Sequence, residues 1–195
     1  VSDPSDPQTI VINANATIVQ QLYIACFGRP ASPTELNNYV SQLNSGSLTV
    51  NGLAQAINGT KEFESVNTGI TLSDQVSQLY FNLFNDRVVG DDGIQFWVDK
   101  INGGEIVLAE VAISLINDVK DYSTRDDFEI DDLNTITNKT NAAIAYTIAI
   151  SQNSAANICY VAQSADPFVA GRAYTEAISY ITGITKDNAY TDAGI

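Results

Sequence analysis

The chain has 195 residues, of which 45% are hydrophobic and 16% charged, a balance typical of a folded globular protein. Its net charge of −14, from 23 acidic and 9 basic residues, excludes a nucleic-acid-binding role because the phosphates would be repelled. The sequence has no histidine or methionine, which removes common general bases and metal ligands, and no apolar run reaches the ~18 residues that a membrane-spanning helix needs.

An extended N-terminal arm is predicted over residues 1–14. Two Asp-Pro steps disfavour helix there, because proline restricts the residue before it, and a β-branched run follows at residues 9–12. The pattern fits a loosely packed terminus as well as an arm that docks on a neighbouring molecule. Since the sequence starts at Val1, we expect a processed or excised piece of a longer protein.

The middle of the chain contains an internal duplication. Residues 19–27 align with residues 76–84, and after a one-residue insertion the match continues with a constant offset. The later pairs are Leu36 and Ile94, Tyr39 and Trp97, Val40 and Val98, Leu43 and Ile101, Asn44 and Asn102, Gly46 and Gly104, Leu53 and Val111, Ala54 and Ala112, and Ile57 and Leu115. We therefore expect helical repeat 1 over residues 15–66 and helical repeat 2 over residues 67–120.

Each repeat has the pattern of two antiparallel helices followed by a short third one. Apolar residues recur at helical spacing in the first helix, and Ser32-Pro33-Thr34-Glu35 is a capping box that predicts where the second helix begins. We expect a shared core in which the following pairs are buried: Leu22 and Leu79, Phe27 and Phe84, Leu36 and Ile94, and Leu43 and Ile101.

The duplicated unit resembles a repeat of unknown function found in bacterial surface-layer and other secreted proteins. The resemblance lies in Leu22-Tyr23, in Phe27-Gly28-Arg29-Pro30, and in the later Leu36, Tyr39, Leu43 and Gly46, while repeat 2 supplies Gly93-Ile94-Gln95-Phe96-Trp97. It covers residues 15–120. It implies a secreted, extracellular protein of the cell surface, similar to the N-terminal anchoring region of a surface-layer protein.

Four residues at matched positions are the candidates for glycan binding. Arg29 and Arg87 follow the first helix of each repeat, where they either bond the free carbonyls of the helix end or grip an anionic sugar or phosphate. Tyr39 and Trp97 either form a sugar-stacking platform or act as core wedges that close the hairpin. Both alternatives stay open at this point.

An acidic stretch from residue 117 to residue 133 is predicted to link the repeats to a C-terminal helical part, residues 121–195. Carboxylates at this density are either solvated or held by a hard cation such as calcium, although their spacing fits no EF-hand loop. The proposed calcium ligands are Asp126, Asp127, Glu129, Asp131 and Asp132. Beyond them, a helix or broken helix pair is predicted over residues 131–162 and another from Asp166 to Gly183, so the whole chain is expected to be all-α.

The two cysteines, Cys26 and Cys159, are either buried free thiols or one disulfide. Because Cys26 aligns with the apolar Leu83, its position predicts a buried face of the first helix.

The favoured function is a non-catalytic structural module that assembles with copies of itself, as a homo-oligomer or lattice, and binds surface polysaccharide or lipopolysaccharide. The first alternative is a subunit of an extracellular filament in which the N-terminal arm docks on the next copy. The second is a polysaccharide hydrolase that uses paired carboxylates such as Asp91-Asp92 or Asp126-Asp127.

Overall fold

The computed structural model describes residues 9–85, 87, 89–121, 127–153 and 172–188. Within these ranges the regular secondary structure is entirely helical, which confirms the all-α prediction. The helices are α1 (Ala14–Phe27), α2 (Pro33–Ser45), α3 (Val50–Asn58), α4 (Lys61–Asn67), α5 (Leu72–Phe84), α6 (Asp91–Asn102), α7 (Leu108–Asp121), α8 (Asp127–Ser151) and α10 (Arg172–Thr182).

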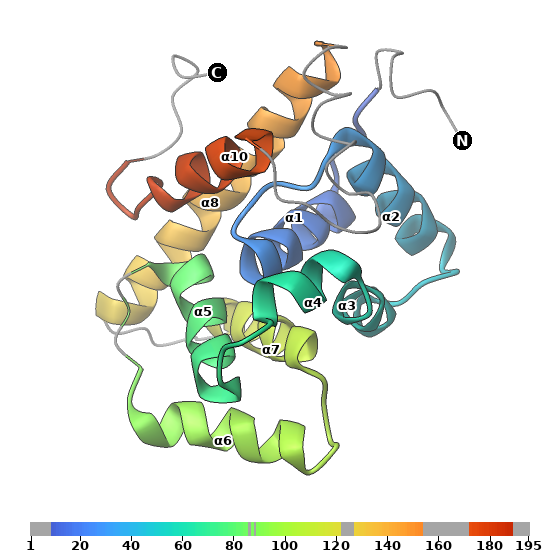
Figure 1. Cartoon of the computed structure of the whole chain (residues 1–195). Coiled ribbons are helices and arrows are strands. Elements are labelled where there is room, and N and C mark those ends of the chain that lie inside the picture. The colour runs from blue at the N-terminus through green and yellow to red at the C-terminus, as the bar shows by residue number, and fades with distance from the viewer. Residues whose placement is uncertain (1–8, 86, 88, 122–126, 154–171, 189–195) are drawn as a thin grey trace.

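The first helix, α1, lies in the middle of the molecule, and α2, α5, α7 and α8 pack against it (Figure 1). All of its residues from Val19 onward are buried, including two glutamines, so this part of the helix has no solvent face. The buried Gln20 amide donates to Thr147 Oγ1 at 2.8 Å and accepts from the Ala31 backbone N–H at 2.9 Å. These bonds satisfy a polar side chain that would otherwise destabilise the core.

Helices at matched positions of the two repeats pack on each other, α1 on α5 and α3 on α7. Within each repeat the first two helices form a packed pair, α1 with α2 and α5 with α6. The helical hairpins are therefore present as predicted. That the two repeats superpose stays a prediction.

The predicted core is confirmed for the first helix of each repeat but not for the whole second helix. Leu22, Phe27, Leu36, Leu79 and Phe84 are all buried. The remaining three predicted positions, Leu43, Ile94 and Ile101, are only partly buried, which corrects the expectation.

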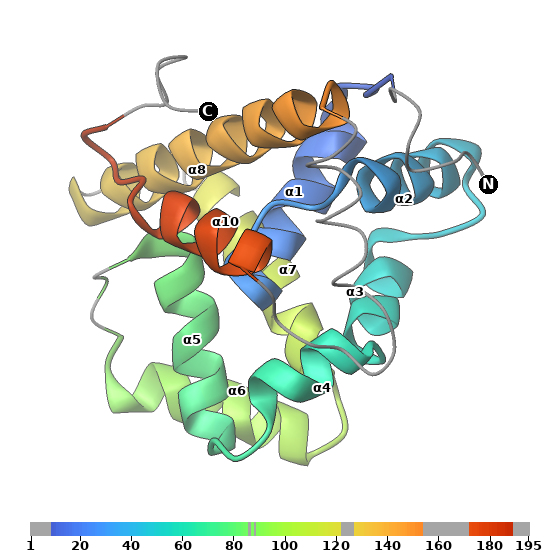
Figure 2. The same ribbon diagram turned by 45° about the horizontal axis from the view of Figure 1, so that its top comes forward.

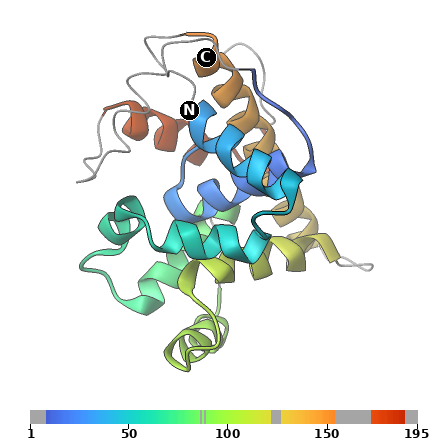
Figure 3. The same cartoon turned by 90° about the vertical axis from the view of Figure 1, so that its right-hand side faces the viewer.

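The position of α6 explains the incomplete burial of Ile94 and Ile101 in repeat 2. It lies at one edge of the molecule, away from α8 and α10, in all three views (Figures 1, 2 and 3). Its inner face packs on α5, where Trp97 and Val98 are buried, while Phe96 on its outer face is 52% exposed. The second helix of repeat 2 therefore shields fewer apolar residues than its counterpart α2.

The helix ends follow local rules that the sequence displays. Both halves of the predicted capping box form, with Glu35 N–H donating to Ser32 Oγ and Ser32 N–H donating to the Glu35 carboxylate. α1 ends at Gly28 with φ of 67°, and the matched end of α5 is Asn85 with φ of 59°. Asparagine is among the non-glycine residues that adopt positive φ most readily, so the backbone can turn at this point in both repeats.

The acidic stretch is not a simple linker. α7 continues to Asp121 and α8 begins at Asp127, so helix occupies much of the segment that was predicted to connect two parts. An acidic sequence suits a helix N-terminus because the helix dipole is positive there. α8 packs on both α1 and α5, and Figure 2 shows it lying across α1. The C-terminal helices thus share a core with the repeats.

The predictions for the N-terminal arm and for the cysteines concern residues that the structure describes only in part. Asn37 Nδ2 donates to the Thr9 carbonyl at 3.0 Å, and Ile10 packs on the core, so the end of the arm lies against α2. Cys26 is buried with a free thiol, whereas Cys159 lies outside the described residues. Burial raises the pKa of the Cys26 thiol far above its ordinary value. None of the described helices combines the length and the apolar character that crossing a membrane requires.

Candidate functional site

The two arginines at matched turns have different surroundings. Arg29 has no exposed surface, and its five N–H donors all have partners. Nε and Nη2 donate to Glu62 at 2.7 and 2.5 Å, Nη1 and Nη2 donate to Glu35 at 3.1 Å each, and Nη1 donates to the Pro30 carbonyl at 2.8 Å. Arg29 therefore binds carboxylates of its own chain more than the helix-end carbonyls that the sequence predicted.

The two glutamates that hold Arg29 titrate differently. Burial raises the pKa of Glu62, and the hydrogen bonds and charge of Arg29 only partly offset this, so that its pKa lies above the ordinary value. Burial also acts to raise the pKa of Glu35, but the charge and hydrogen bonds of Arg29 together with those of Ser32 outweigh it, so that this pKa is lowered. The cluster combines one fully buried arginine with a buried carboxylate, Glu62, and a partly buried one, Glu35.

Arg87 is at the surface, with 38% of its side chain exposed. Its Nη1 donates to Asp132 of α8, and its guanidinium carbon lies 5.7 Å from the centre of the Phe84 ring. Arg87 is thus accessible to a ligand, whereas Arg29 is not.

The two aromatic candidates lie mostly inside the hairpins. Trp97 is 9% exposed, and its indole N–H donates to the Tyr80 hydroxyl at 3.0 Å. Tyr39 is half-buried, with its ring centre 6.3 Å from that of Tyr23. Both positions match core wedges that close the hairpin. Together with the arginines, these residues occupy four different elements rather than one platform.

The predicted calcium ligands are only partly described. Asp126 lies outside the described residues, as do the side chains of Asp127 and Glu129. Asp131 pairs with Lys186 at 2.9 Å, and Asp132 pairs with Arg87. No group of three or more metal-ligating side chains occurs among the residues that the structure describes. The calcium site stays a prediction.

The paired carboxylates Asp91 and Asp92 are exposed in the first turn of α6. They follow Gly90, which is the N-cap, and no side chain caps this helix. The positive end of the helix dipole stabilises negative side chains in the first turn, which explains the position of these two carboxylates.

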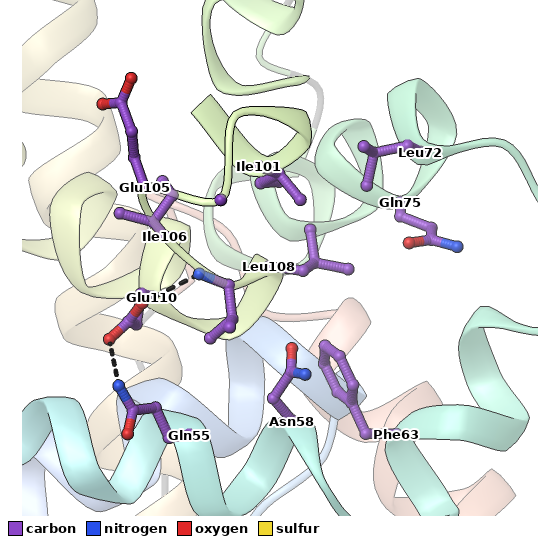
Figure 4. Close-up of a pocket in the computed structure, with 12 residues that line it drawn as sticks. Gln55, Asn58, Phe63, Leu72, Gln75, Ile101, Glu105, Ile106, Leu108 and Glu110 are labelled. Atoms are coloured by element: carbon purple, nitrogen blue, oxygen red, sulfur yellow. Dashed lines mark hydrogen bonds between the residues drawn. The ribbon is translucent and has the colours of Figure 1, made fainter. Parts of the chain in front are cut away.

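A pocket of about 500 Å³ lies where α3 and α4 of repeat 1 meet the helices of repeat 2 (Figure 4). We call it the seam pocket. It is lined by Gln55, Asn58, Phe63, Leu72, Gln75, Ile101, Gly104, Glu105, Ile106, Val107, Leu108 and Glu110. In Figure 4 Asn58 and Phe63 lie on one side of it, and Leu72 and Gln75 come from α5.

Each of the three amide side chains of the seam pocket uses one end to bind the protein. Gln55 Nε2 donates to Glu110 at 3.1 Å, and Asn58 Oδ1 accepts from the Ala109 backbone N–H at 3.4 Å. Gln75 Nε2 donates to two backbone carbonyls at 3.0 and 3.2 Å. The other ends, Gln55 Oε1, Asn58 Nδ2 and Gln75 Oε1, have no hydrogen-bond partner among the described residues.

The two carboxylates of the seam pocket are bound to their own chain. Glu110 accepts from Gln55 and, at 2.9 Å, from the Val107 backbone N–H (Figure 4). Glu105 pairs with Lys100 at 2.8 Å. The apolar side chains that line the pocket include Phe63, Leu72, Ile101, Ile106 and Leu108.

Sequence reasoning missed the seam pocket. Its amides come from α3 and α5. In an amphipathic helix, polar residues between apolar ones are expected to face solvent, so the pattern alone does not indicate a pocket. The pocket exists because α3 packs on α7 across the two repeats. The only available signal was the match between residues 53–57 and 111–115, which marks both helices as core elements without showing that they touch.

Comparisons with protein-family models, with curated proteins and with solved structures find no match to this chain. The resemblance to surface-layer repeats therefore stands on the quoted residues alone.

Proposed function

We propose that this protein is a non-catalytic module of a bacterial cell surface that binds a glycan in the seam pocket and packs with copies of itself. The observation that carries the proposal is that the pocket lining combines amide groups without partners among the described residues with apolar side chains. Asn58 Nδ2 offers a donor, while Gln55 Oε1 and Gln75 Oε1 offer acceptors. A sugar ring presents hydroxyls that both donate and accept, together with apolar C–H faces, so its chemistry is complementary to this pocket.

The charge of the chain supports a neutral ligand at this site. The net charge of −14 repels anions at long range, and the seam pocket itself contains Glu105 and Glu110. A neutral hexose or amino sugar with an acetylated nitrogen avoids this repulsion. Binding through a few hydrogen bonds in an open pocket would be weak for one copy, but assembly on a surface multiplies it through effective concentration.

The pocket carboxylates support binding rather than hydrolysis. Glycoside hydrolysis needs one carboxylic acid and one free carboxylate on opposite sides of the scissile bond. Here Glu110 accepts a backbone and a side-chain hydrogen bond, and Glu105 is paired with a lysine. Both groups would have to leave their partners before they could act on a substrate.

The filament alternative is supported by one observation at the N-terminus. Val11 and Ile12 each expose 48% of their surface beside the point where the arm rests on α2. Contact of this apolar segment with a second copy would bury it. Truncation of residues 1–12, followed by sedimentation at increasing protein concentration, tests this alternative separately from glycan binding.

The glycan proposal is tested by titrating the protein with glucose, galactose, mannose and N-acetylglucosamine and following the side-chain amide signals by NMR. We expect one of these sugars to shift the signals of Asn58 and Gln75. Asn58→Asp keeps the oxygen that faces the Ala109 N–H and removes the donor, so it should weaken binding about tenfold while the fold is retained.

Asn51→Asp is the matched control, because Asn51 is an exposed amide on the same helix and does not line the pocket. Equal weakening in both variants would indicate a general charge effect. Absence of any shift at the pocket amides with all four sugars would contradict the proposal.

A further inference from the structure

The two matched arginines differ in which carboxylates reach them. With the constant offset between the repeats, the position of Glu35 corresponds to Gly93, and the position of Glu62 corresponds to Lys120. Repeat 2 therefore lacks both carboxylates that hold Arg29 in repeat 1. Among the described residues, Arg87 instead pairs with one carboxylate, that of Asp132 in α8.

Because Asp132 replaces the two glutamates, one edge of the Arg87 guanidinium is left without a carboxylate in the described part of the chain. Its Nη1 donates to Asp132, while Nε and Nη2 have no partner among the described residues. The same Nε and Nη2 edge of Arg29 holds Glu62 through two parallel bonds of 2.7 and 2.5 Å. A planar pair of donors at this spacing matches the two oxygens of a carboxylate.

Arg87 lines a cavity of about 250 Å³ between α5 and the start of α6. The cavity is lined by Ser77, Tyr80, Phe81, Asn85, Arg87, Val89 and Ile94. The Tyr80 hydroxyl accepts from Trp97, and its own proton has no acceptor among the described residues. Asn85 donates from Nδ2 to the Ile184 carbonyl at 2.8 Å, but its buried Oδ1 has no partner.

These groups are complementary to a ligand that carries both an anionic group and hydroxyl groups. Arg87 supplies two donors to an anion, the Tyr80 proton supplies a third, and Asn85 Oδ1 requires a donor in return. The exposed Phe81 and the half-buried Ile94 provide apolar walls for a ring. A hydroxylated carboxylic acid of sugar type satisfies all of these groups at once.

We propose that this cavity is a second binding site, specific for the carboxylate of a uronic acid residue of an acidic polysaccharide. The internal precedent is Arg29, whose guanidinium already selects carboxylates in the matched turn. A carboxylate carries one negative charge, so the −14 chain repels it less than a phosphate dianion. The site does not depend on the seam pocket, which is lined by different residues.

The test is calorimetric titration of the whole chain with sodium glucuronate, with glucose and with inorganic phosphate. Glucuronate is expected to bind, and glucose is expected to bind at least about tenfold more weakly because it lacks the carboxylate. Arg87→Lys keeps a cation beside Asp132 and removes the planar pair of donors, so it should weaken glucuronate binding about tenfold with an unchanged unfolding midpoint.

Lys61→Gln is the control for a general loss of positive charge, because Lys61 is an exposed cation outside both pockets. Retention of glucuronate binding in Lys61→Gln and its loss in Arg87→Lys would support the site. Tighter binding of phosphate than of glucuronate, or equal binding of glucose, would overturn it. Self-association that depends on Arg87, in a chain that does not bind glucuronate, would assign the open edge to a carboxylate of a second copy and also overturn the proposal.

Discussion

Arg29 and Glu62 form a buried bidentate ion pair, in which Nε and Nη2 of the arginine donate to both carboxylate oxygens at 2.7 and 2.5 Å. The pair joins the turn after α1 to α4, and the guanidinium carbon also lies 4.1 Å from the centre of the Tyr174 ring of α10. A single residue thus connects three parts of the fold. Loss of one partner would leave charge in a site without solvent.

We expect Arg29→Met to destabilise the protein by about 3–5 kcal/mol, because the buried Glu62 and the partly buried Glu35 would lose their counter-ion. The free energy of unfolding in urea measures this. The control is Lys61→Met, which breaks the exposed pair with Glu64 and should cost about 1 kcal/mol or less. Similar costs for the two variants would contradict the assignment of a buried ion cluster.

The same cluster predicts how stability depends on pH. The pKa of Glu62 is raised above its ordinary value of 4.5, so the folded state binds its proton more tightly and gains stability as pH falls from neutral toward 4.5. The pKa of Glu35 is lowered, so its stabilising contribution is present above 4.5 and is lost as pH falls through the lowered value. Glu62 therefore changes the stability of the protein above pH 4.5, and Glu35 changes it below pH 4.5.

Glu62→Gln removes the first contribution because glutamine does not titrate. Relative to this variant, the wild-type protein should gain stability between neutral pH and 4.5, as measured by urea unfolding at several pH values. Parallel curves for the two proteins across this range would show that Glu62 does not carry the raised pKa.

The buried face of α5 predicts the cost of core truncation. Leu79→Ala and Phe84→Ala should each destabilise by about 2–5 kcal/mol, because both side chains are 5% exposed or less and would leave a cavity. Phe81→Ala is the control on the same helix, since Phe81 is 41% exposed, and its cost should stay near 0.5 kcal/mol. Thermal or urea unfolding distinguishes the two classes, and a near-zero cost at Leu79 would refute the predicted core.

Calcium is expected to support assembly or surface attachment, as the acidic stretch predicts. Chelator added to the assembled protein should weaken the assembly, as measured by sedimentation. The same loss is expected in a variant in which the five proposed ligands are amidated, namely Asp126, Asp127, Glu129, Asp131 and Asp132. Asp126→Asn alone should change stability little in calcium-free buffer. Full retention of assembly under both treatments would contradict a role for calcium and would leave direct sugar or protein contacts as the remaining explanation.

Sequence reasoning reached the features that depend on neighbours a few residues apart. The capping box at Ser32 and Glu35 and the burial of Leu79 and Phe84 follow from spacing along one helix. It placed the boundary of α8 too late, because charge density suggested solvated coil where the chain forms a helix N-terminus. It also treated Arg29 and Arg87 as equivalents, although Glu35, which lies close after Arg29, corresponds to Gly93 in repeat 2. The second carboxylate, Glu62, is distant in sequence and could not be assigned to Arg29 from local pattern.

The sequence by itself determined the all-α class, the start of α2 and the inward faces of the first helices, because a capping box and helical periodicity act within a few residues. Only the tertiary structure decided which surfaces stay open. Glu62, one of the two carboxylates bound to Arg29, is 33 residues away from it. α8 and α10 contribute contacts such as Thr147 and Tyr174 to repeat 1, and repeat 2 keeps an accessible Arg87. Two aligned stretches thus acquire different chemistry, because the carboxylates that reach each arginine and the elements that pack against each helix are different.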